Sequence, residues 1–173
     1  MTPLVCRSCG ATWLSDPAAA LMKSRDRTCL RCDGEVEWES DSERIVRQHF
    51  VALNNGDEQA LAETLDPAVV VCPAVPVAAM GLPAAMRGIP AVLAGVRSLK
   101  EDFTGWCYDV RAIDEHDGGC VICEGSVSVT AVHGGSEAPQ VFWVIRLRDG
   151  RIVEKRGFDH PDAARRALEV CKT

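Results

Sequence analysis

Two strand-like stretches around one turn decide the fold: QVFWVIRLR at residues 140–148 and RIVEKRGF at residues 151–158, joined by Asp149-Gly150. Asp-Gly suits a tight hairpin turn because both residues tolerate positive φ angles. The same two-residue alternation appears earlier, at about 105–114 and 119–132, again between glycine-rich separators. This pattern predicts four strands that form an antiparallel meander.

Before the meander, apolar residues recur with the spacing of an α-helix. Ser40-Asp41-Ser42-Glu43 is a capping-box sequence, and the helix it opens is expected to end at Asn54-Asn55-Gly56. The other expected elements are a short helix capped by Asp57, a strand at Val69–Cys72, a helix from Pro90 to about Asp102 and a last helix that opens at His160-Pro161-Asp162.

The N-terminal region contains two Cys-x-x-Cys pairs, Cys6/Cys9 and Cys29/Cys32. Four thiolates at this spacing fit one tetrahedral Zn²⁺, so we expect a zinc ribbon over residues 1–40. A dithiol redox pair or plain disulfides are the alternative. A four-thiolate zinc site is closed to substrate, so its predicted role is structural.

The other five cysteines are Cys72, Cys107, Cys120, Cys123 and Cys171, which we expect to stay reduced. Cys120 and Cys123 repeat the Cys-x-x-Cys spacing within a predicted strand. Residues three apart on a strand face opposite sides, so this pair is interpreted as packing residues.

The sequence shows no stretch of 18 apolar residues and no signal-peptide pattern, which indicates a cytoplasmic protein without a membrane span.

The charge pattern argues against nucleic-acid binding. The net charge is −6, and neither residues 1–40 nor residues 41–173 carry an excess of Lys and Arg. A ribbon that grips phosphates normally has such an excess.

The order of elements resembles the nuclear transport factor two-like fold, a cone whose curved sheet wraps a helix-lined cavity. His49-Phe50-Val51-Ala52-Leu53-Asn54-Asn55-Gly56-Asp57, Leu65-Asp66-Pro67 and Arg148-Asp149-Gly150-Arg151-Ile152-Val153 resemble motifs of its SnoaL-like and ketosteroid-isomerase-like branches. We therefore expect an α+β protein: a small zinc ribbon at 1–40, then a cone domain at 41–173 with a curved antiparallel sheet wrapped around helices. The superfamily contains isomerases, cyclases, hydrolases and non-catalytic binders, so the resemblance leaves the activity open.

The isomerase mechanism implied by the resemblance needs a carboxylate base and two donors for an oxyanion. The base position falls at Cys72, one donor at His49 and the other near Trp143. None of these is the residue of the isomerase family, so steroid isomerase activity is not expected.

SnoaL-like cyclases use an acid/base Asp near the end of the last strand, where this chain has Asp159. Asp159 is therefore a candidate catalytic residue, with His49 as its partner. Two ordinary structural roles compete with these hypotheses: Asp159 as the cap of the last helix, and His49 as a core histidine with satisfied hydrogen bonds.

Aromatic residues of the meander are candidates for lining a ligand cavity. Trp106 and Tyr108 share one face of a predicted strand, and Trp143 lies on the inward face of another. With Cys72, these form the predicted ligand site, although core packing explains them equally well. Residues Ile122, Glu124, Ser126 and Ser128 are expected on the outer face of the sheet, where two copies could meet as a homodimer.

Two functions fit the sequence. In the first, the cone binds a small apolar molecule with a carbonyl group, with Asp159 as acid/base and His49 or Tyr108 as donors. In the second, the protein is a regulator or scaffold whose ribbon binds a protein partner and whose cone domain dimerises.

Overall fold

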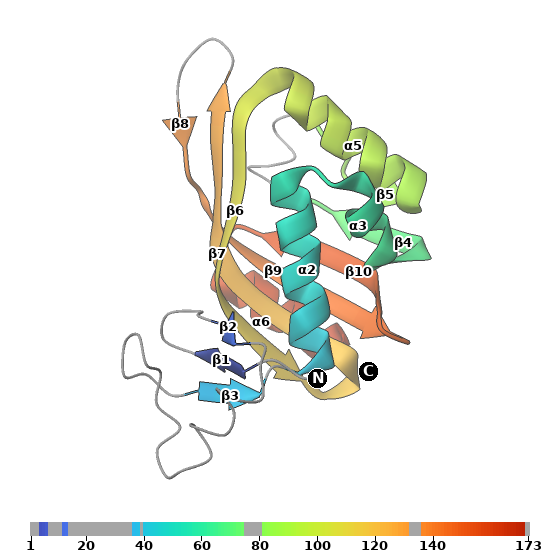
Figure 1. Cartoon of the computed structure of the whole chain (residues 1–173), viewed down its shortest axis with the longest axis vertical. Coiled ribbons are helices and arrows are strands. Elements are labelled where there is room, and N and C mark those ends of the chain that lie inside the picture. Colours follow the sequence, from blue (N-terminus) through green and yellow to red (C-terminus); the bar gives the residue numbers. More distant parts are fainter. Residues whose placement is uncertain are drawn as a thin grey trace.

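The computed structural model describes residues 4–6, 12–13, 36–38, 40–74, 81–131 and 136–171 of the chain. Its main body is a curved sheet with helices on both faces (Figure 1). The elements of this body are α2 (Asp41–Asn55), α3 (Glu58–Glu63), β4 (Leu65–Cys72), β5 (Met86–Arg87), α5 (Ile89–Asp102), β6 (Phe103–His116), a 3₁₀ turn (Asp117–Gly119), β7 (Cys120–Ala131), β8 (Ser136–Glu137), β9 (Gln140–Arg148), β10 (Arg151–Phe158) and α6 (Pro161–Cys171).

The sheet has the strand order β5-β4-β10-β9-β7-β6, with β8 paired to β7. Strands β6, β7, β9 and β10 each pair antiparallel with the next, which confirms the predicted meander. Strand β10 then pairs in parallel with β4. The sheet is therefore mixed, whereas the sequence indicated a purely antiparallel one; the α+β class is confirmed.

Strand β4 begins earlier than expected, at Leu65 instead of Val69. Its pairing with β10 jumps from Leu65 to Val70, so the residues between them leave the ladder. Pro67 lies in this gap, where its missing N–H costs no ladder hydrogen bond.

The helix caps follow the sequence closely. Ser40 and Glu43 form the predicted capping box at the start of α2. Gly56 ends the helix with a φ of 65°, a left-handed conformation that favours glycine. Asp57 caps α3 by accepting a hydrogen bond from the Ala60 amide.

The sheet bends at a β-bulge in β6. Val110 pairs with Gly125 and Ala112 with Glu124, so Arg111 is an extra residue on β6. A Cβ atom at position 125 would lie 2.1 Å from the carbonyl oxygen of Asp109, so the close approach of the two strands requires glycine. The bulge also shifts the alternation of the strand: Tyr108 and Ile113, five residues apart, both belong to or pack on the inner core.

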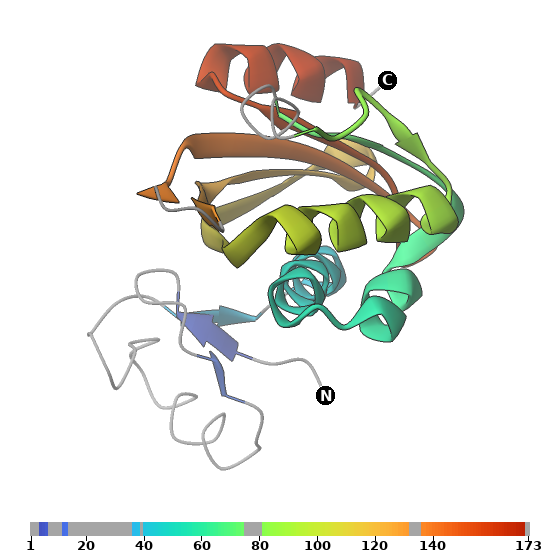
Figure 2. The ribbon, with the colours of Figure 1, turned by 90° about the horizontal axis from the view of Figure 1, so that it is seen from above.

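Three layers result, with the sheet between α6 on one side and α2, α3 and α5 on the other (Figure 2). The inner core lies between the sheet and α2, α3 and α5, and includes Val121, Cys123, Val127 and Val129 of β7. A smaller core lies under α6, where Ala164 and Leu168 pack on outward residues of β7 and β9. Ile122, expected on an open outer face, packs in this second core, so α6 covers that part of the face.

A disulfide joins Cys120 at the start of β7 to Cys171 at the end of α6. The prediction that both thiols stay reduced is wrong in this structure, because folding brings two cysteines 51 residues apart in sequence into bonding distance. Cys123 is a buried free thiol on the opposite face. The two cysteines therefore point to opposite sides of β7, as the interpretation of the pair as packing residues required.

In the N-terminal region, β1 (Leu4–Cys6) pairs antiparallel with β2 (Thr12–Trp13) and with β3 (Val36–Trp38). Cys6 is buried at the end of β1. Cys9, Cys29 and Cys32 lie outside the described residues, so the zinc site stays a prediction. Within the ranges that the structure describes, no group of three or more potential metal ligands lies together. No helix there is long and apolar enough to span a membrane.

Reduction of the Cys120–Cys171 disulfide should lower the free energy of unfolding by about 4 kcal/mol, because it releases a loop of 51 residues in the unfolded chain. Urea unfolding with and without a phosphine reductant measures this. The Cys171→Ala variant should lose the dependence on reductant, whereas Cys107→Ser, which changes an exposed free thiol, should keep it. A wild-type unfolding midpoint that ignores reductant would contradict the disulfide.

Candidate active site

A cavity of about 40 Å³ lies in the inner core, and we call it the inner cavity. Its wall is mostly apolar, with residues such as Leu53, Val92 and Trp143. A larger hollow of about 370 Å³, which we call the mouth, is lined by Phe103, Trp106 and the exposed residues Asn54 and Lys100. The two adjoin, because the residues in both walls are Leu53, Val96, Leu99 and Tyr108.

A lysine amine lies in the wall of the inner cavity. Lys155 of β10 is only 5% exposed, and its Nζ lies 3.0 Å from Nε2 of His49. The same nitrogen is 4.4 Å from the centre of the Phe50 ring and 5.1 Å from that of Tyr108. The ion pairs that the structure describes include none between Lys155 and a carboxylate. The amine is therefore held by an imidazole and two aromatic faces.

The hydrogen bonds around His49 have a defined direction. The Thr64 hydroxyl donates to the carbonyl of Leu61 at 2.8 Å, so its oxygen accepts from Nδ1 of His49 at 3.1 Å. Nδ1 then carries the proton of the neutral ring, and Nε2 is an acceptor. Lys155 donates to Nε2. This network is a chain of donors that runs from Lys155 through His49 and Thr64 into the backbone.

Each member of the chain comes from a different element. His49 lies on the buried face of α2 with Ile45, Val46 and Phe50. Thr64 ends α3, and its carbonyl accepts a hydrogen bond of 2.9 Å from the amide of Ile152 on β10. The end of α3 is therefore tied to the strand that carries Lys155, which fixes the distance between hydroxyl, imidazole and amine.

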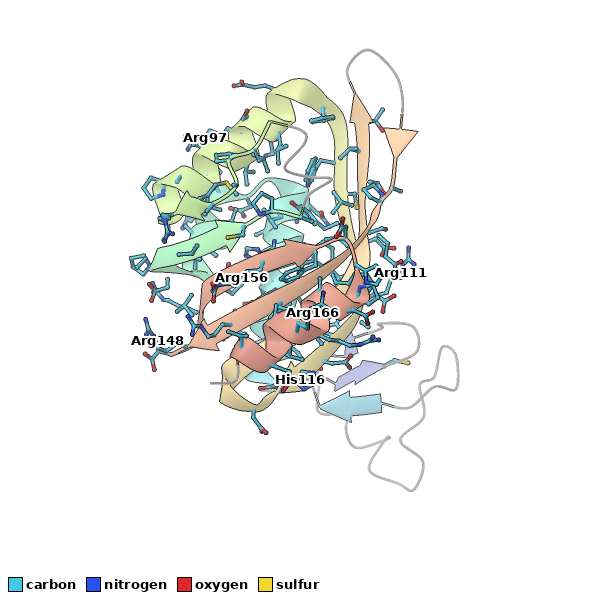
Figure 3. The ribbon with its side chains drawn as sticks, turned by 180° about the vertical axis from the view of Figure 1, so that it is seen from behind. Arg97, Arg111, His116, Arg148, Arg156 and Arg166 are labelled. Atoms are coloured by element: carbon cyan, nitrogen blue, oxygen red, sulfur yellow. A yellow bond between two sulfur atoms is a disulfide. The ribbon has the colours of Figure 1, made fainter. Side chains whose placement is uncertain are left out.

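A second bulge turns Lys155 inward. The pairing of β10 with β9 shifts between Ile152 and Glu154, so Val153 is an extra residue. Ile152 is fully buried in the inner core, and strict alternation would place Glu154 beside it and Lys155 outside. After the bulge the faces are exchanged, so that Lys155 points inward and Glu154 points outward. Arg156, the next residue, is visible from the α6 side in Figure 3 and pairs with Glu154 there.

Tyr108 is held at the boundary of the two hollows by a side chain of α2. Asn54 accepts a hydrogen bond from the Tyr108 amide at 2.7 Å and donates one to its carbonyl at 2.9 Å. The Asn54 side-chain amide thus makes the two hydrogen bonds to the Tyr108 backbone that a neighbouring strand would otherwise make. Burial raises the pKa of the Tyr108 phenol, so the group remains a neutral donor across the physiological range.

Burial also sets the charge of the two nitrogen bases. It lowers the pKa of Lys155 to about 7, and Cys123 acts weakly in the other direction. The pKa of His49 is lowered well below its usual value, first by burial and then by the charge of Lys155. Burial raises the pKa of Cys123 to about 12, so this thiol stays neutral. At neutral pH the site therefore contains a neutral imidazole and an amine that is part neutral, part ammonium.

Most of the predicted site residues come together. His49, Cys72, Tyr108 and Trp143 line the inner cavity, and Trp106 lines the mouth with Tyr108. The three positions that the isomerase resemblance assigned to base and donors therefore surround one hollow, with a thiol, an imidazole and an indole. Their part in ligand binding remains a prediction.

Asp159 lies elsewhere. It is exposed in the bend between β10 and α6 and belongs to the wall of neither hollow. Its expected capping role falls instead to His160, whose Nδ1 accepts a hydrogen bond from the Asp162 amide at 3.3 Å. The resemblance that suggested Asp159 correctly locates the end of β10. The titratable side chain of this strand that faces inward is Lys155, four residues before Asp159.

The sequence analysis missed Lys155 and Thr64. The sequence RIVEKRGF contains no signal for a bulge, and regular alternation from the buried Ile152 would place Lys155 at the surface. The run of three charged residues, Glu154-Lys155-Arg156, could have indicated an inward charge. Adjacent strand residues point to opposite faces, so at least one of the three must point away from the other two.

With this geometry in view, comparison with known proteins places the chain. A family model described as the SnoaL-like domain matches residues 46–155. The chain belongs to the SnoaL-like domain family. None of the curated proteins matches its sequence.

Solved structures share the fold of this SnoaL-like domain. An NTF2-like protein of unknown function from Burkholderia pseudomallei is 22% identical, with a TM-score of 0.64 over 75% of this chain and 98% of its own. TerC co-crystallised with polyporic acid is 16% identical, with a TM-score of 0.63 over 75% and 99%. An LEH-like epoxide hydrolase from M. tuberculosis is 21% identical, with a TM-score of 0.57 over 75% and 90%. At these identities the similarity establishes the fold.

The lowered pKa of Lys155 makes a prediction about the stability of the SnoaL-like domain. Between about pH 7 and 10 the folded chain has lost the proton of Lys155, whereas the unfolded chain keeps it, so burial of this residue becomes less costly as pH rises. The stability advantage of Lys155→Met over wild type should therefore shrink by about 2 kcal/mol from pH 7 to pH 9.

Urea unfolding at several pH values measures this difference. Arg156→Met is the matched control, since it removes a cation of the same strand on the opposite face and should show no such trend. Parallel pH profiles for wild type and Lys155→Met would contradict a lowered pKa.

Proposed function

We propose that the cone of this SnoaL-like domain binds an apolar small molecule with a carbonyl group, and that Lys155 moves a proton on that molecule. The observation that carries the proposal is the buried amine of Lys155 in the cavity wall, 3.0 Å from His49 and with no ion-pair partner among the residues that the structure describes. A partly neutral amine in an apolar cavity is a competent general base near neutral pH.

The lining of the hollows supports an apolar ligand. Leu82, Met86 and Val92 surround the inner cavity, and Phe103 and Trp106 flank the mouth. Few polar groups interrupt the surface of the inner cavity, which is the usual character of a small-molecule site. Two solved structures of the same fold also support a small-molecule ligand: one was co-crystallised with polyporic acid, and another is an epoxide hydrolase.

The chemistry follows from the two protonation states of Lys155. The neutral amine takes a proton from the carbon next to the carbonyl, and the resulting ammonium is stabilised by the rings of Phe50 and Tyr108 and by Nε2 of His49. The negative charge that develops on the carbonyl oxygen needs a donor, and the neutral Tyr108 phenol is available. Return of the proton to a different atom completes an isomerisation, and attack of the enolate on a second carbonyl of the ligand is a cyclisation.

His49 has a supporting part in this scheme. Its low pKa keeps it neutral, so it does not compete with Lys155 for the substrate proton. Instead it orients the amine, because Thr64 fixes the tautomer that leaves Nε2 as an acceptor.

Exchange of α-hydrogens tests the function. With 2-tetralone as probe in D₂O near pH 7, the wild-type protein should speed deuterium incorporation above the buffer rate, as followed by proton NMR. Lys155→Met should reduce the enhancement about 100-fold or more, the usual size of a general-base contribution. Arg156→Met should keep it. Equal rates for wild type and Lys155→Met would reject Lys155 as the base.

We also propose that Cys6, Cys9, Cys29 and Cys32 bind one structural Zn²⁺. The support is their spacing and the place of Cys6 at the end of β1, a strand that pairs with both of its neighbours in the small N-terminal sheet. A cytoplasmic location, a homodimer and a protein partner for the ribbon stay predictions.

Native mass spectrometry tests the metal site. Protein made in zinc-supplemented medium should carry one zinc per chain, Cys29→Ser should lose it, and Cys107→Ser should retain it. Wild-type protein that carries no zinc, with these cysteines joined as disulfides, would contradict the ribbon.

A further inference from the structure

Resting on the proposed function, we propose that Lys155 is also a nucleophile, which condenses with an aldehyde or ketone in the inner cavity to form an imine. The ligand class is then an aromatic or otherwise flat apolar molecule with an accessible carbonyl at one end.

The first argument is the availability of the amine. A lysine with the ordinary pKa of about 10.4 is neutral in only about one molecule in 2,500 at pH 7. Lys155, with a pKa of about 7, is neutral in roughly half of the molecules at that pH. Desolvation in an apolar pocket is a recognised means of activating lysine for covalent chemistry with carbonyls.

The groups around the amine leave it free to react. The titratable groups that face it are His49 from α2, Tyr108 from β6 and Cys123 from β7, and Cys72 of β4 shares the cavity wall. At neutral pH His49 and Tyr108 are neutral, and so is the buried thiol of Cys123. The hydrogen bond to His49 uses one N–H and fixes the nitrogen in place.

The second argument is the shape of the two hollows. The inner cavity, at about 40 Å³, has room for a carbonyl group and little more. The mouth, at about 370 Å³, has room for the body of the ligand. The end that reaches the amine must therefore be small and unbranched.

A continuous row of aromatic rings joins the mouth to the amine. Ring centres lie 6.1 Å apart for Phe103 and Trp106, 5.4 Å for Trp106 and Tyr108, and 5.5 Å for Tyr108 and Phe50. Lys155 Nζ then lies over Phe50. The rings of this row that line the mouth, Phe103, Trp106 and Tyr108, offer stacking surface to a flat molecule, so they favour an aromatic body with the carbonyl foremost.

The step balances without any further reactant. Nζ attacks the carbonyl carbon, a carbon–nitrogen bond forms, and one amine proton moves to the carbonyl oxygen. A second proton from nitrogen reaches the same oxygen, the carbon–oxygen bond breaks, and water leaves. The apolar wall slows the reverse reaction, because hydrolysis needs water at the imine carbon.

Reductive trapping tests the inference on the full-length wild-type protein. The probe is 2-naphthaldehyde at pH 7 with sodium cyanoborohydride, followed by intact mass and peptide mapping. The chain has four lysines, at positions 23, 100, 155 and 172. We expect one reduced adduct at Lys155, at least tenfold faster than at the other lysines, with a rate that rises with pH to a midpoint near 7. Peptide mapping separates this adduct from any at the N-terminal amine.

Two variants complete the test. Lys155→Met should abolish the adduct, and Arg156→Met should keep it. Quenching of tryptophan fluorescence measures probe binding independently. Binding without an adduct at Lys155 would overturn the imine and leave the proposed function standing. Equal labelling of Lys100 and Lys155 would also overturn it. Absence of both binding and adduct would overturn the imine and count against the proposed function.

Discussion

The burial of one amine that has no carboxylate partner in the described part of the chain is the constraint on which the site depends. Removing an ammonium from water costs several kcal/mol, and the protein offsets this with an imidazole acceptor, two ring faces and a lowered pKa. The same burial keeps His49 neutral and Tyr108 protonated. The burial that makes Lys155 costly to the fold is also what lowers its pKa, on which the proposed function depends. A cost of this kind in a cavity wall is typical of a functional group, since an apolar residue would stabilise the fold better.

Two bulges connect the fold to this chemistry. The extra residue Arg111 in β6, opposite Gly125, bends the sheet and places Tyr108 and Ile113 on the same side. The extra residue Val153 in β10 exchanges the faces of Glu154 and Lys155. Without the second bulge, a carboxylate would face the inner cavity in place of the amine. A single inserted residue thus determines whether the site contains an acid or a base.

Membership of the SnoaL-like family indicates where the cavity lies, whereas the residues that line the cavity indicate which chemistry is available there. Cys72, His49 and Trp143 occupy the positions that the isomerase resemblance assigned to base and donors, and they do surround one hollow. None of the three is the residue that the isomerase family uses at that position. The basic group comes instead from β10, the strand between those that carry Cys72 and Trp143, and it contacts His49. The fold therefore keeps a cavity at this place, and the function proposed for it depends on which strand supplies the polar group.

The sequence by itself determined the caps of α2, the glycine at its end, the four strands of the meander and the aromatic lining, because each depends on residues close together in the chain. It also placed His49 on the buried face of its helix. Only the tertiary structure decided the parallel pairing of β4 with β10, the Cys120–Cys171 disulfide and the inward direction of Lys155. The strand pairing and the disulfide depend on contacts between segments far apart in the sequence, and the direction of Lys155 depends on a bulge. The local alternation of side chains predicts neither.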